Sequence, residues 1–576
     1  MPSSAPLLRV RDLTLSHAGA EHPSPHGVSF DVDAGEVVLL LGPSGSGKST
    51  LTLALNGLIP QSVPATMTGT VEVAGHGTAD TAVARLSCDI AMVFQDPDAQ
   101  LVTGTVLDEV AFALENLLLP VAEILERSEQ ALRTVGLWER RTENPDRLSG
   151  GGRQRLAIAC ALAMQPRMIV LDEPTANLDP QGIDDVYDAL RALVSDAGRA
   201  IVLVEHNLDA AMRFATRVLV LDRDGRLAFD GPVAEVLRTH ADELIEMGVW
   251  LPSSLLAARR MRDSGVMLDP LPLTPEELVD ALAGVSSRSA RGATGEEPSA
   301  RGSAGEEPAV APRAEGETER AAEAPAVSIR SLTVTKQRAE ILHGIDLDIE
   351  AESFTAIVGA NGAGKTTLVQ ALAGVVAPPK RTVRIEDLDA GTASPRRLSA
   401  HIGFVFQNPE HQFIAHTVRD ELSHGLRLQR LDPHEIDARV DDVLGRFGLT
   451  HKADTHPFLL SGGEKRRLSV GTAIVTRPRV LALDEPTFGQ DRARAAELLD
   501  LLSGLRNEGT TVVIVTHDLQ LVADYATHTV ILRDGRVHAA GPTAGLLADP
   551  SVFESAGLRL PPLLRMLPAG PSGATP

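Results

Sequence analysis

The chain has 576 residues, of which 43% are hydrophobic and 23% are charged, so it can bury globular cores and is not disordered as a whole. Its net charge of −23 and an aromatic content of 3% disfavour a nucleic-acid partner. Two cysteines are too few for a disulfide framework, the N-terminus lacks the apolar stretch of a signal peptide, and no apolar run approaches the roughly 18 residues of a membrane span. We therefore expect a cytosolic protein that reaches a membrane only through a partner.

The same series of motifs occurs twice in the same order. A glycine-rich motif that ends at Lys48 recurs 317 residues later at Lys365, and the phenylalanine–glutamine pair at Gln95 recurs 312 residues later at Gln407. Offsets this steady predict two copies of one domain rather than a short solenoid repeat. We place the copies at residues 1–283 and 327–576.

Short apolar runs alternate with helical patterns within each copy. The segments Val37–Leu41, Met168–Leu171 and Ile201–Val204 are typical of strands that are buried on both faces of a mainly parallel sheet. Leucines at helical spacing follow the first run, at Leu51, Leu55 and Leu58. This alternation predicts an α/β fold with a nucleotide crevice at the carboxyl ends of the strands.

A glycine-rich loop that matches GxxxxGK[ST] follows the first apolar run of this kind in each copy. The first loop comprises Gly42, Pro43, Ser44, Gly45, Ser46, Gly47, Lys48 and Ser49, with Thr50 after it. The second comprises Gly359, Ala360, Asn361, Gly362, Ala363, Gly364, Lys365 and Thr366, with Thr367 after it. Glycines allow successive N–H groups to face phosphate oxygens, and the following helix adds its positive end. We expect the two lysines to neutralise phosphates and the hydroxyls of Ser49 and Thr366 to bind Mg²⁺. A purely structural turn is the alternative, and two matches disfavour it.

An acidic pair ends a later apolar run in each copy. We expect Asp172 and Asp484 to bind Mg²⁺ through water, and Glu173 and Glu485 to polarise the attacking water. A helix cap after a buried strand is the alternative use of such a pair.

A histidine follows the next apolar run in each copy. A lone histidine at such a place is more often a surface residue, but His206 and His517 recur at the same place relative to the acidic pair. We therefore expect each of them to donate a hydrogen bond to the γ-phosphate.

Residues 284–326 differ in composition from both copies. They contain no aromatic residue and are rich in Ala, Gly, Ser, Pro, Arg and Glu, with the decapeptides SARGATGEEP and SARGSAGEEP in succession. Such a segment cannot bury enough apolar surface to offset its ordering entropy, so we expect a flexible linker, with a folded element as the alternative. As a coil it would span roughly 35–40 Å, enough for two domains to meet face to face.

The sequence LSGG at Leu148–Gly151 and Leu460–Gly463, together with the motifs above, resembles the ATP-binding cassette (ABC) ATPases over both copies. The resemblance implies ATP and Mg²⁺ as ligands, a helical subdomain that carries LSGG, and two cassettes that pair head to tail. Each ATP would then lie between one phosphate loop and the opposite signature. The signature residues implied are Ser149, Gly150, Gly151, Ser461, Gly462 and Gly463, and Asp179 and Asp491 fall where the family has a dimer-contacting loop.

The segments FQDPDAQLVTGTVLDEVAFALEN and FQNPEHQFIAHTVRDELSHGL resemble the ATPases of energy-coupling factor (ECF) transporters more narrowly, as does a C-terminal extension at residues 231–284. The resemblance implies that Gln95 and Gln407 sense the γ-phosphate and Mg²⁺, beside a groove that holds helices of a membrane protein. It implies an ATPase at the cytoplasmic face of the cell membrane, which energises uptake of a vitamin or cofactor precursor or of a transition-metal ion. The implied partners are a transmembrane coupling protein and a substrate-binding membrane subunit.

The sequence departs from the family pattern in two places. The fifth signature residue, commonly Gln, is Gly152 in one copy and Glu464 in the other, from which we expect tuning rather than loss of activity. The aromatic that stacks on adenine is absent, with His17 and Gln337 nearest to its place, so the choice between ATP and GTP stays open.

Two alternative functions remain. One is the ATPase of another ABC transporter class, such as a sugar importer or an exporter. The other is a soluble ABC translation factor, which the acidic linker and the acidic total disfavour, and we expect no nucleic-acid partner. The transported substrate is open, because nothing in the chain would contact it.

Overall fold

The computed structural model describes residues 5–17, 22–175, 180–194, 198–205, 208–263, 265–292, 324–336, 339–487, 492–561 and 564. The chain divides into two compact units, each described here by itself. The first comprises Met1–Pro275 with Gly489–Glu497, and the second comprises Glu276–Phe488 with Leu498–Pro576. No helix among the described residues is long and apolar enough to cross a membrane.

Two sheets form the first unit. The larger has the order β10-β9-β3-β8-β7-β6, and its neighbours are parallel except for the antiparallel pair β9–β10. Its strands are β3 (Val37–Leu41), β6 (Ile90–Val93), β7 (Met168–Asp172), β8 (Ala200–Val204), β9 (Arg217–Leu221) and β10 (Leu227–Pro232). The smaller sheet is antiparallel, with the order β2-β1-β4-β5. Its strands are β1 (Leu8–Ser16), β2 (Val28–Val32), β4 (Thr66–Val73) and β5 (His76–Gly77).

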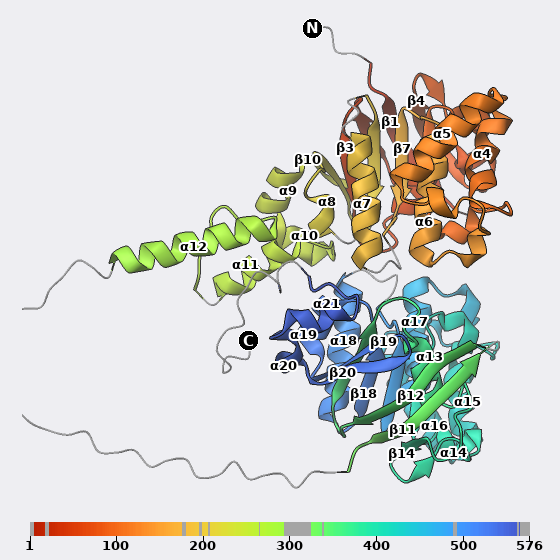
Figure 1. Cartoon of the computed structure of the whole chain (residues 1–576), viewed down its shortest axis with the longest axis vertical. Helices are drawn as coiled ribbons and strands as arrows, with labels where there is room; N and C mark the ends of the chain where they lie inside the picture. Colours follow the sequence, from red (N-terminus) through yellow and green to blue (C-terminus); the bar gives the residue numbers. More distant parts are fainter. Residues whose placement is uncertain are drawn as a thin grey trace, which may run out of the picture. The chain divides into compact units, whose positions relative to one another are not determined.

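The helices of the first unit include a bundle of α4, α5 and α6, which pack against one another beside the sheet (Figure 1). The helices are α1 (Lys48–Leu55), α2 (Leu58–Gln61), α3 (Val83–Leu86), α4 (Val106–Asn116), α5 (Val121–Thr134), α6 (Gly150–Ala163), α7 (Pro180–Val194), α8 (Leu208–Ala211), α9 (Val233–Thr239), α10 (Ala241–Met247) and α11 (Ser253–Asp263). Short 3-10 turns are η1 (Pro97–Ala99), η2 (Trp138–Arg140) and η3 (Pro145–Arg147).

The second unit repeats this plan. Its larger sheet has the order β16-β17-β18-β13-β19-β20, parallel except for β19–β20, and its smaller sheet is antiparallel, with the order β12-β11-β14-β15. The strands are β11 (Val327–Lys336), β12 (Ala339–Ile349), β13 (Phe354–Gly359), β14 (Val383–Ile385), β15 (Leu388–Asp389), β16 (Ile402–Val405), β17 (Val480–Asp484), β18 (Thr511–Val515), β19 (His528–Arg533) and β20 (Arg536–Pro542). The helices are α13 (Lys365–Leu372), α14 (Pro395–Leu398), α15 (Val418–Gln429), α16 (Pro433–Arg446), α17 (Gly462–Ile474), α18 (Arg492–Asn507), α19 (Leu519–Tyr525), α20 (Thr543–Leu547) and α21 (Pro550–Ser555), with 3-10 turns η4 (Pro409–Gln412), η5 (Thr450–Lys452) and η6 (Pro457–Leu459).

The central strands are buried on both faces, which explains their continuous apolar sequence. In β3, Val37, Leu39 and Leu41 belong to one core cluster, whereas Val38 and Leu40 belong to the cluster on the other face. Side chains alternate along a strand, so a strand between two layers needs apolar residues at every position. The predicted α/β fold, with two tandem domains built on mainly parallel sheets, is confirmed.

Helix α12 (Pro275–Gly292) runs into residues 284–292, the first part of the segment predicted to be a linker. The next described element, β11, begins at Val327. Residues 293–323 of the predicted linker lie outside the described residues.

Candidate nucleotide-binding sites

The glycine-rich loop of each unit connects the central strand to a helix. Gly45 and Gly47 have φ of +82° and +86°, and Gly362 and Gly364 have φ of +82° and +96°, conformations that favour glycine. A Cβ on Gly45 or Gly362 would meet no atom within 4 Å, so open space lies over the middle of each loop. The loops therefore leave room for a ligand to approach the backbone closely, as the predicted phosphate cradle requires.

In each loop, the amino group of a buried lysine binds the backbone carbonyl oxygens of the first two loop residues. Lys48 Nζ donates hydrogen bonds to the carbonyl oxygens of Gly42 (2.7 Å) and Pro43 (3.0 Å). Lys365 Nζ donates in the same way to Gly359 (2.7 Å) and Ala360 (3.1 Å). Helices α1 and α13 begin at these lysines, so a positive charge and a helix N-terminus lie together, which suits a triphosphate.

The predicted metal ligands are hard oxygen donors at the ends of buried strands. Asp172 ends β7 and Asp484 ends β17, and both are buried. Thr366 Oγ1 donates a hydrogen bond to Asp484 Oδ1 (3.2 Å), which brings together two of the residues predicted to bind Mg²⁺. Burial raises the pKa of Asp484 to about 6, while the hydrogen bond from Thr366 opposes this shift. Hydroxyl and carboxylate oxygens are the ligands that Mg²⁺ prefers, so the donor set fits this ion.

Each predicted catalytic glutamate has a side-chain partner among the described residues. Gln95 Nε2 donates to Glu173 Oε2 (2.7 Å) in the first unit, whereas His517 Nδ1 lies 3.0 Å from Glu485 Oε1 in the second. Burial lowers the pKa of His517, but the hydrogen bond and the charge of Glu485 raise it further, so the net direction is upward. The raised pKa favours the protonated ring, and its cause is the hydrogen bond with Glu485.

Some of the predicted site residues lie outside the described residues. These are His206, Asp179, Asp491 and Gln337. His17 is described, and its Nε2 lies 3.4 Å from Thr50 Oγ1, beside the start of α1.

The signature serines are the N-caps of long helices. Ser149 Oγ accepts the N–H of Gly152 (3.2 Å) at the start of α6, and Ser461 Oγ accepts the N–H of Glu464 (3.4 Å) at the start of α17. Glu464 Oε2 also accepts the N–H of Ser461 (2.8 Å), which completes a capping box. Helix N-termini of this kind are suited to binding anions. The pairing of each signature with the opposite phosphate loop stays a prediction.

A buried glutamate that was not predicted from the sequence holds the chain after the predicted catalytic glutamine in both units. Glu109 Oε2 accepts the N–H groups of Val102 (3.0 Å) and Thr103 (2.6 Å). Glu421 Oε2 accepts those of Ile414 (2.9 Å) and Ala415 (2.7 Å). The signal was available, because an Asp-Glu pair stands at the same place in both copies. A buried carboxylate with two backbone donors fixes the loop that connects the sheet to the helical bundle.

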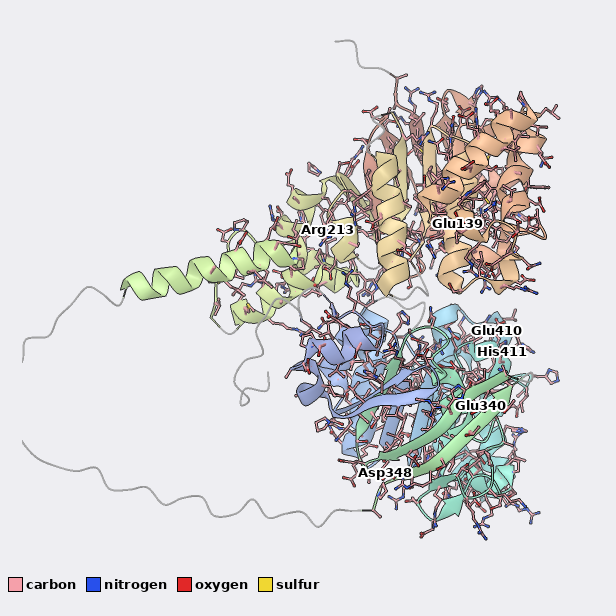
Figure 2. The ribbon with its side chains drawn as sticks, viewed as in Figure 1. Glu139, Arg213, Glu340, Asp348, Glu410 and His411 are labelled. Carbon is pink, nitrogen blue, oxygen red and sulfur yellow. The ribbon has the colours of Figure 1, made fainter. Side chains whose placement is uncertain are left out.

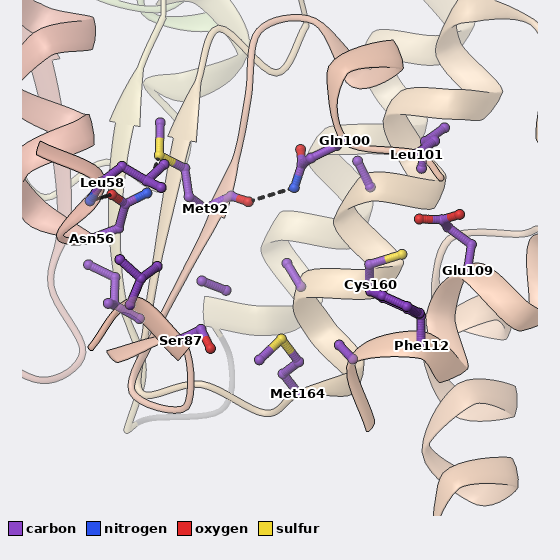
Figure 3. Close-up of a pocket in the computed structure, with 16 residues that line it drawn as sticks. Asn56, Leu58, Ser87, Met92, Gln100, Leu101, Glu109, Phe112, Cys160 and Met164 are labelled. Carbon is purple, nitrogen blue, oxygen red and sulfur yellow. Dashed lines mark hydrogen bonds between the residues drawn. The ribbon is translucent and has the colours of Figure 1, made fainter. Parts of the chain in front are cut away.

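A cavity of about 250 Å³ opens beside the Gln95 loop in the first unit. Figure 3 shows Met92, Gln100, Phe112, Cys160 and Met164 around it. They come from strand β6, the loop after it, helices α4 and α6, and the C-cap of α6. Gln100 Nε2 donates to the Met92 carbonyl (2.9 Å) at its edge. The lining is largely apolar, so the cavity suits apolar side chains.

Comparison with known proteins gives concordant matches. A family model described as "ABC transporter" matches residues 25–176 and 342–488. A putative HMP/thiamine import ATP-binding protein of Bacillus subtilis is 35% identical over 558 residues, which cover 96% of this chain and 95% of that protein. A putative ABC transporter ATP-binding protein of Methanosarcina acetivorans is 35% identical over 562 residues, 97% of this chain and 89% of that protein. The solved structure of cbiO1 from Clostridium perfringens, described as part of the ABC transporter complex cbiONQ, is 32% identical and covers 42% of this chain and 99% of that chain, with a TM-score of 0.37.

The family match falls on both units and includes both phosphate loops, both signatures and both acidic pairs. The similarity to the Bacillus subtilis protein extends over nearly the whole length of both chains. This chain therefore belongs to the ABC transporter family of ATP-binding proteins, and the family match occurs twice in tandem along it.

Proposed function

We propose that the chain is the ATP-hydrolysing subunit of an ECF-type membrane importer and that it acts at the cytoplasmic face of the cell membrane. The observation that carries this proposal is a loop lysine and a partnered glutamate in both units, together with the contact between Thr366 and Asp484 in the second. The full-length similarity to an import ATP-binding protein supports the import direction. A vitamin or cofactor precursor, or a transition-metal ion, is the proposed cargo class.

Each site would divide its work among a few side chains. Mg²⁺, when bound, supplies charge that offsets the triphosphate, and the residues that would hold it are Ser49, Gln95 and Asp172 in one unit and Thr366, Gln407 and Asp484 in the other. Glu173 and Glu485 accept a hydrogen bond from the attacking water and orient it. Gln95 holds the Glu173 carboxylate in place, and His517 holds that of Glu485.

Closure of the two cassettes on nucleotide is the proposed source of movement. The N-termini of α6 and α17, with Ser149 and Ser461, would each bind the γ-phosphate at the opposite loop. Asp179 and Asp491 would contact the partner cassette. A closed state that needs the triphosphate opens again once the γ-phosphate is lost, because the ligand stabilises only the closed form.

The cavity beside the Gln95 loop is the proposed binding site for a helix of a transmembrane coupling protein. Phe112 lines it and is 49% exposed, so an apolar side chain is available at its rim. Gln100 connects the cavity to strand β6 and to the loop that carries Gln95. A helix bound there would therefore contact the same short loop that reaches Glu173.

Hydrolysis of ATP by the purified full chain tests the enzymatic part. The double variant E173Q/E485Q should bind ATP as tightly as the wild type and hydrolyse it at least about 100-fold more slowly, because the groups that orient water are lost. The variant E139Q, at an exposed glutamate labelled in Figure 2, is the matched control and should hydrolyse ATP normally. Near-normal hydrolysis by the double variant would overturn the role of these glutamates.

Affinity capture from detergent-solubilised membranes tests the partner. The tagged chain should retain a polytopic membrane protein, and the variant F112D should retain much less of it because a carboxylate is placed at the apolar rim. Recovery of ribosomes in place of a membrane protein would favour the soluble translation-factor function instead.

A further inference from the structure

The end of the loop that carries the catalytic glutamine is bound to different elements in the two units. We name residues 94–100 of the first unit and residues 406–412 of the second unit the glutamine segments. In the first unit, Gln100 Nε2 donates to the carbonyl of Met92 (2.9 Å), and its Oε1 accepts the N–H of Phe94 (3.1 Å). Met92 lies in β6, so the end of this segment is attached to the sheet (Figure 3).

Gln412 takes the equivalent place in the second unit, 312 residues after Gln100, but it binds a helix. Its Nε2 donates to the Ser469 carbonyl (2.9 Å) and also bonds Thr472 Oγ1, and its Oε1 accepts the Ser469 hydroxyl (2.8 Å). Ser469 and Thr472 both belong to the signature helix α17. The end of this segment is therefore attached to the signature helix.

The side chains on the signature helix account for the difference. The positions of Ser469 and Thr472 are occupied by Ala157 and Cys160 in the first unit. The side chain of alanine has no hydrogen-bonding group and a thiol is a weak one, so neither replaces the hydroxyl groups of Ser469 and Thr472. Ala157 and Cys160 line the cavity described above.

A buried arginine strengthens the attachment in the second unit. Arg466 Nη1 donates to the Phe406 carbonyl (2.8 Å), and its Nη2 donates to the Gln407 carbonyl (2.6 Å). The equivalent residue of the first unit is Gln154, whose Nε2 donates to the Phe94 carbonyl at 3.4 Å. Two short hydrogen bonds from a charged fork are stronger than one long bond from an amide.

The charge of Arg466 lies near the acidic pair of the second unit, Asp484 and Glu485. An arginine side chain is a cation at neutral pH, so the two hydrogen bonds that Arg466 donates are charge-assisted. The attachment is therefore charge-assisted and next to the proposed hydrolysis site.

A third contact, an ion pair, is present in both units and therefore does not explain the difference between them. Lys465 Nζ lies 2.6 Å from Glu410 Oε1, and Arg153 Nε lies 2.6 Å from Asp98 Oδ1 at the equivalent place. Glu410 is labelled in Figure 2. Both glutamine segments thus have an ion pair to their signature helix, and the difference comes from Arg466 and Gln412.

We propose that Arg466 is a positioning residue which, with Gln412, makes the second glutamine segment move with the signature helix, whereas the first segment moves with strand β6. The inference rests on the proposed role of Gln407 at the nucleotide site. A shift of the helical bundle against the sheet would then carry Gln407 with it, while Gln95 stays at Glu173. The rate of ATP hydrolysis at the second site should therefore depend on the position of its signature helix.

Hydrogen exchange of the nucleotide-free full chain tests the attachment without reference to hydrolysis. In R466Q, the backbone amides of residues 408–415 should exchange at least about tenfold faster than in the wild type, since two charge-assisted hydrogen bonds are lost. The variant R446Q, at an exposed arginine of the same unit, should leave this exchange unchanged. Unchanged exchange in R466Q would overturn the proposal.

Hydrolysis kinetics test the consequence at the site. In an E173Q background, where only the second site hydrolyses ATP, R466Q should lower kcat about tenfold with KM changed less than about twofold, and R466K should recover part of kcat. A kcat within twofold of the parent contradicts the proposal. The proposal is also contradicted if R466K has as low a kcat as R466Q and an equally lowered melting temperature. That result would indicate a structural role for Arg466. If the wild type does not hydrolyse ATP at all, the proposed function fails, and the exchange experiment still decides the attachment.

Discussion

The predicted catalytic glutamate of each site has an unusual backbone conformation. Glu173 and Glu485 have φ of +49° and +48°, a left-handed conformation that non-glycine residues rarely adopt. Their N–H groups donate to the carbonyls of Val204 (2.9 Å) and Val515 (3.0 Å) on the neighbouring strands, which holds this conformation. Strain of order 1–3 kcal/mol is retained at such positions only where the surrounding structure imposes it. The same conformation recurs at the equivalent position of both units, so the fold imposes it.

Substitutions of two glycines in the first phosphate loop should affect nucleotide binding and folding stability to different degrees. Gly45 and Gly47 share a positive φ, but a Cβ on Gly47 would lie 2.5 Å from Ser24 Oγ and 2.7 Å from the Pro25 nitrogen, while one on Gly45 meets no atom. We expect G45A to lose about 1–2 kcal/mol of stability and most of its nucleotide affinity at this site. G47A should be destabilised more. Thermal unfolding and nucleotide titration measure both, and an equal loss of stability in the two variants would contradict the steric argument.

The two signature helices differ as elements although their N-caps are the same. Glu464 completes a capping box on α17, whereas Gly152 at the same position of α6 has no side chain to return a bond to Ser149. Burial raises the pKa of Glu464, but the two hydrogen bonds from Ser461 and nearby positive charges outweigh it, so the net direction is downward. The carboxylate therefore stabilises the folded helix.

This cap predicts a pH-dependent contribution to stability. A carboxyl whose pKa is lower in the folded state contributes above its unfolded value, near pH 4.5, and the contribution is lost as pH falls through the folded value. E464Q keeps the shape without the charge, so it should be less stable than the wild type by about 0.5 kcal/mol at pH 7 and equal to it in strong acid. Melting temperatures at pH 7 and pH 4 measure the difference, with E139Q as a control expected to show none. A difference that grows on acidification would show that the sign is wrong.

At the scale of the whole molecule, two units of one plan differ in how they connect sheet and helices. Both have a loop lysine, an acidic pair and a capped signature, so each unit carries the residues predicted for a nucleotide site. In the second unit, Gln412 of the glutamine segment binds α17, and Arg466 of α17 binds the segment. In the first unit, Gln100 binds strand β6. The proposed closure would thus act on two glutamine segments that are attached in different ways.

Nucleotide-dependent closure has a direct measurement in solution scattering. With ATP and Mg²⁺, the E173Q/E485Q variant should decrease in radius of gyration toward the roughly 25 Å of a compact chain of this length. Adding S149R and S461R should abolish the decrease, because a bulky cation would replace the cap at each helix start. Halves that stay equally far apart with and without nucleotide would contradict the pairing of the cassettes.

The sequence by itself determined the duplicated α/β domains, the phosphate loops and the acidic pairs. These are local patterns, in which strand burial and loop conformation follow from adjacent residues. Only the tertiary structure decided the partners within each site. Gln95 reaches Glu173 across 78 positions, His517 reaches Glu485 across 32, and Arg466 reaches Phe406 across 60. Such contacts depend on strand register and helix packing, which bring distant residues to one edge of the sheet and which no local pattern encodes.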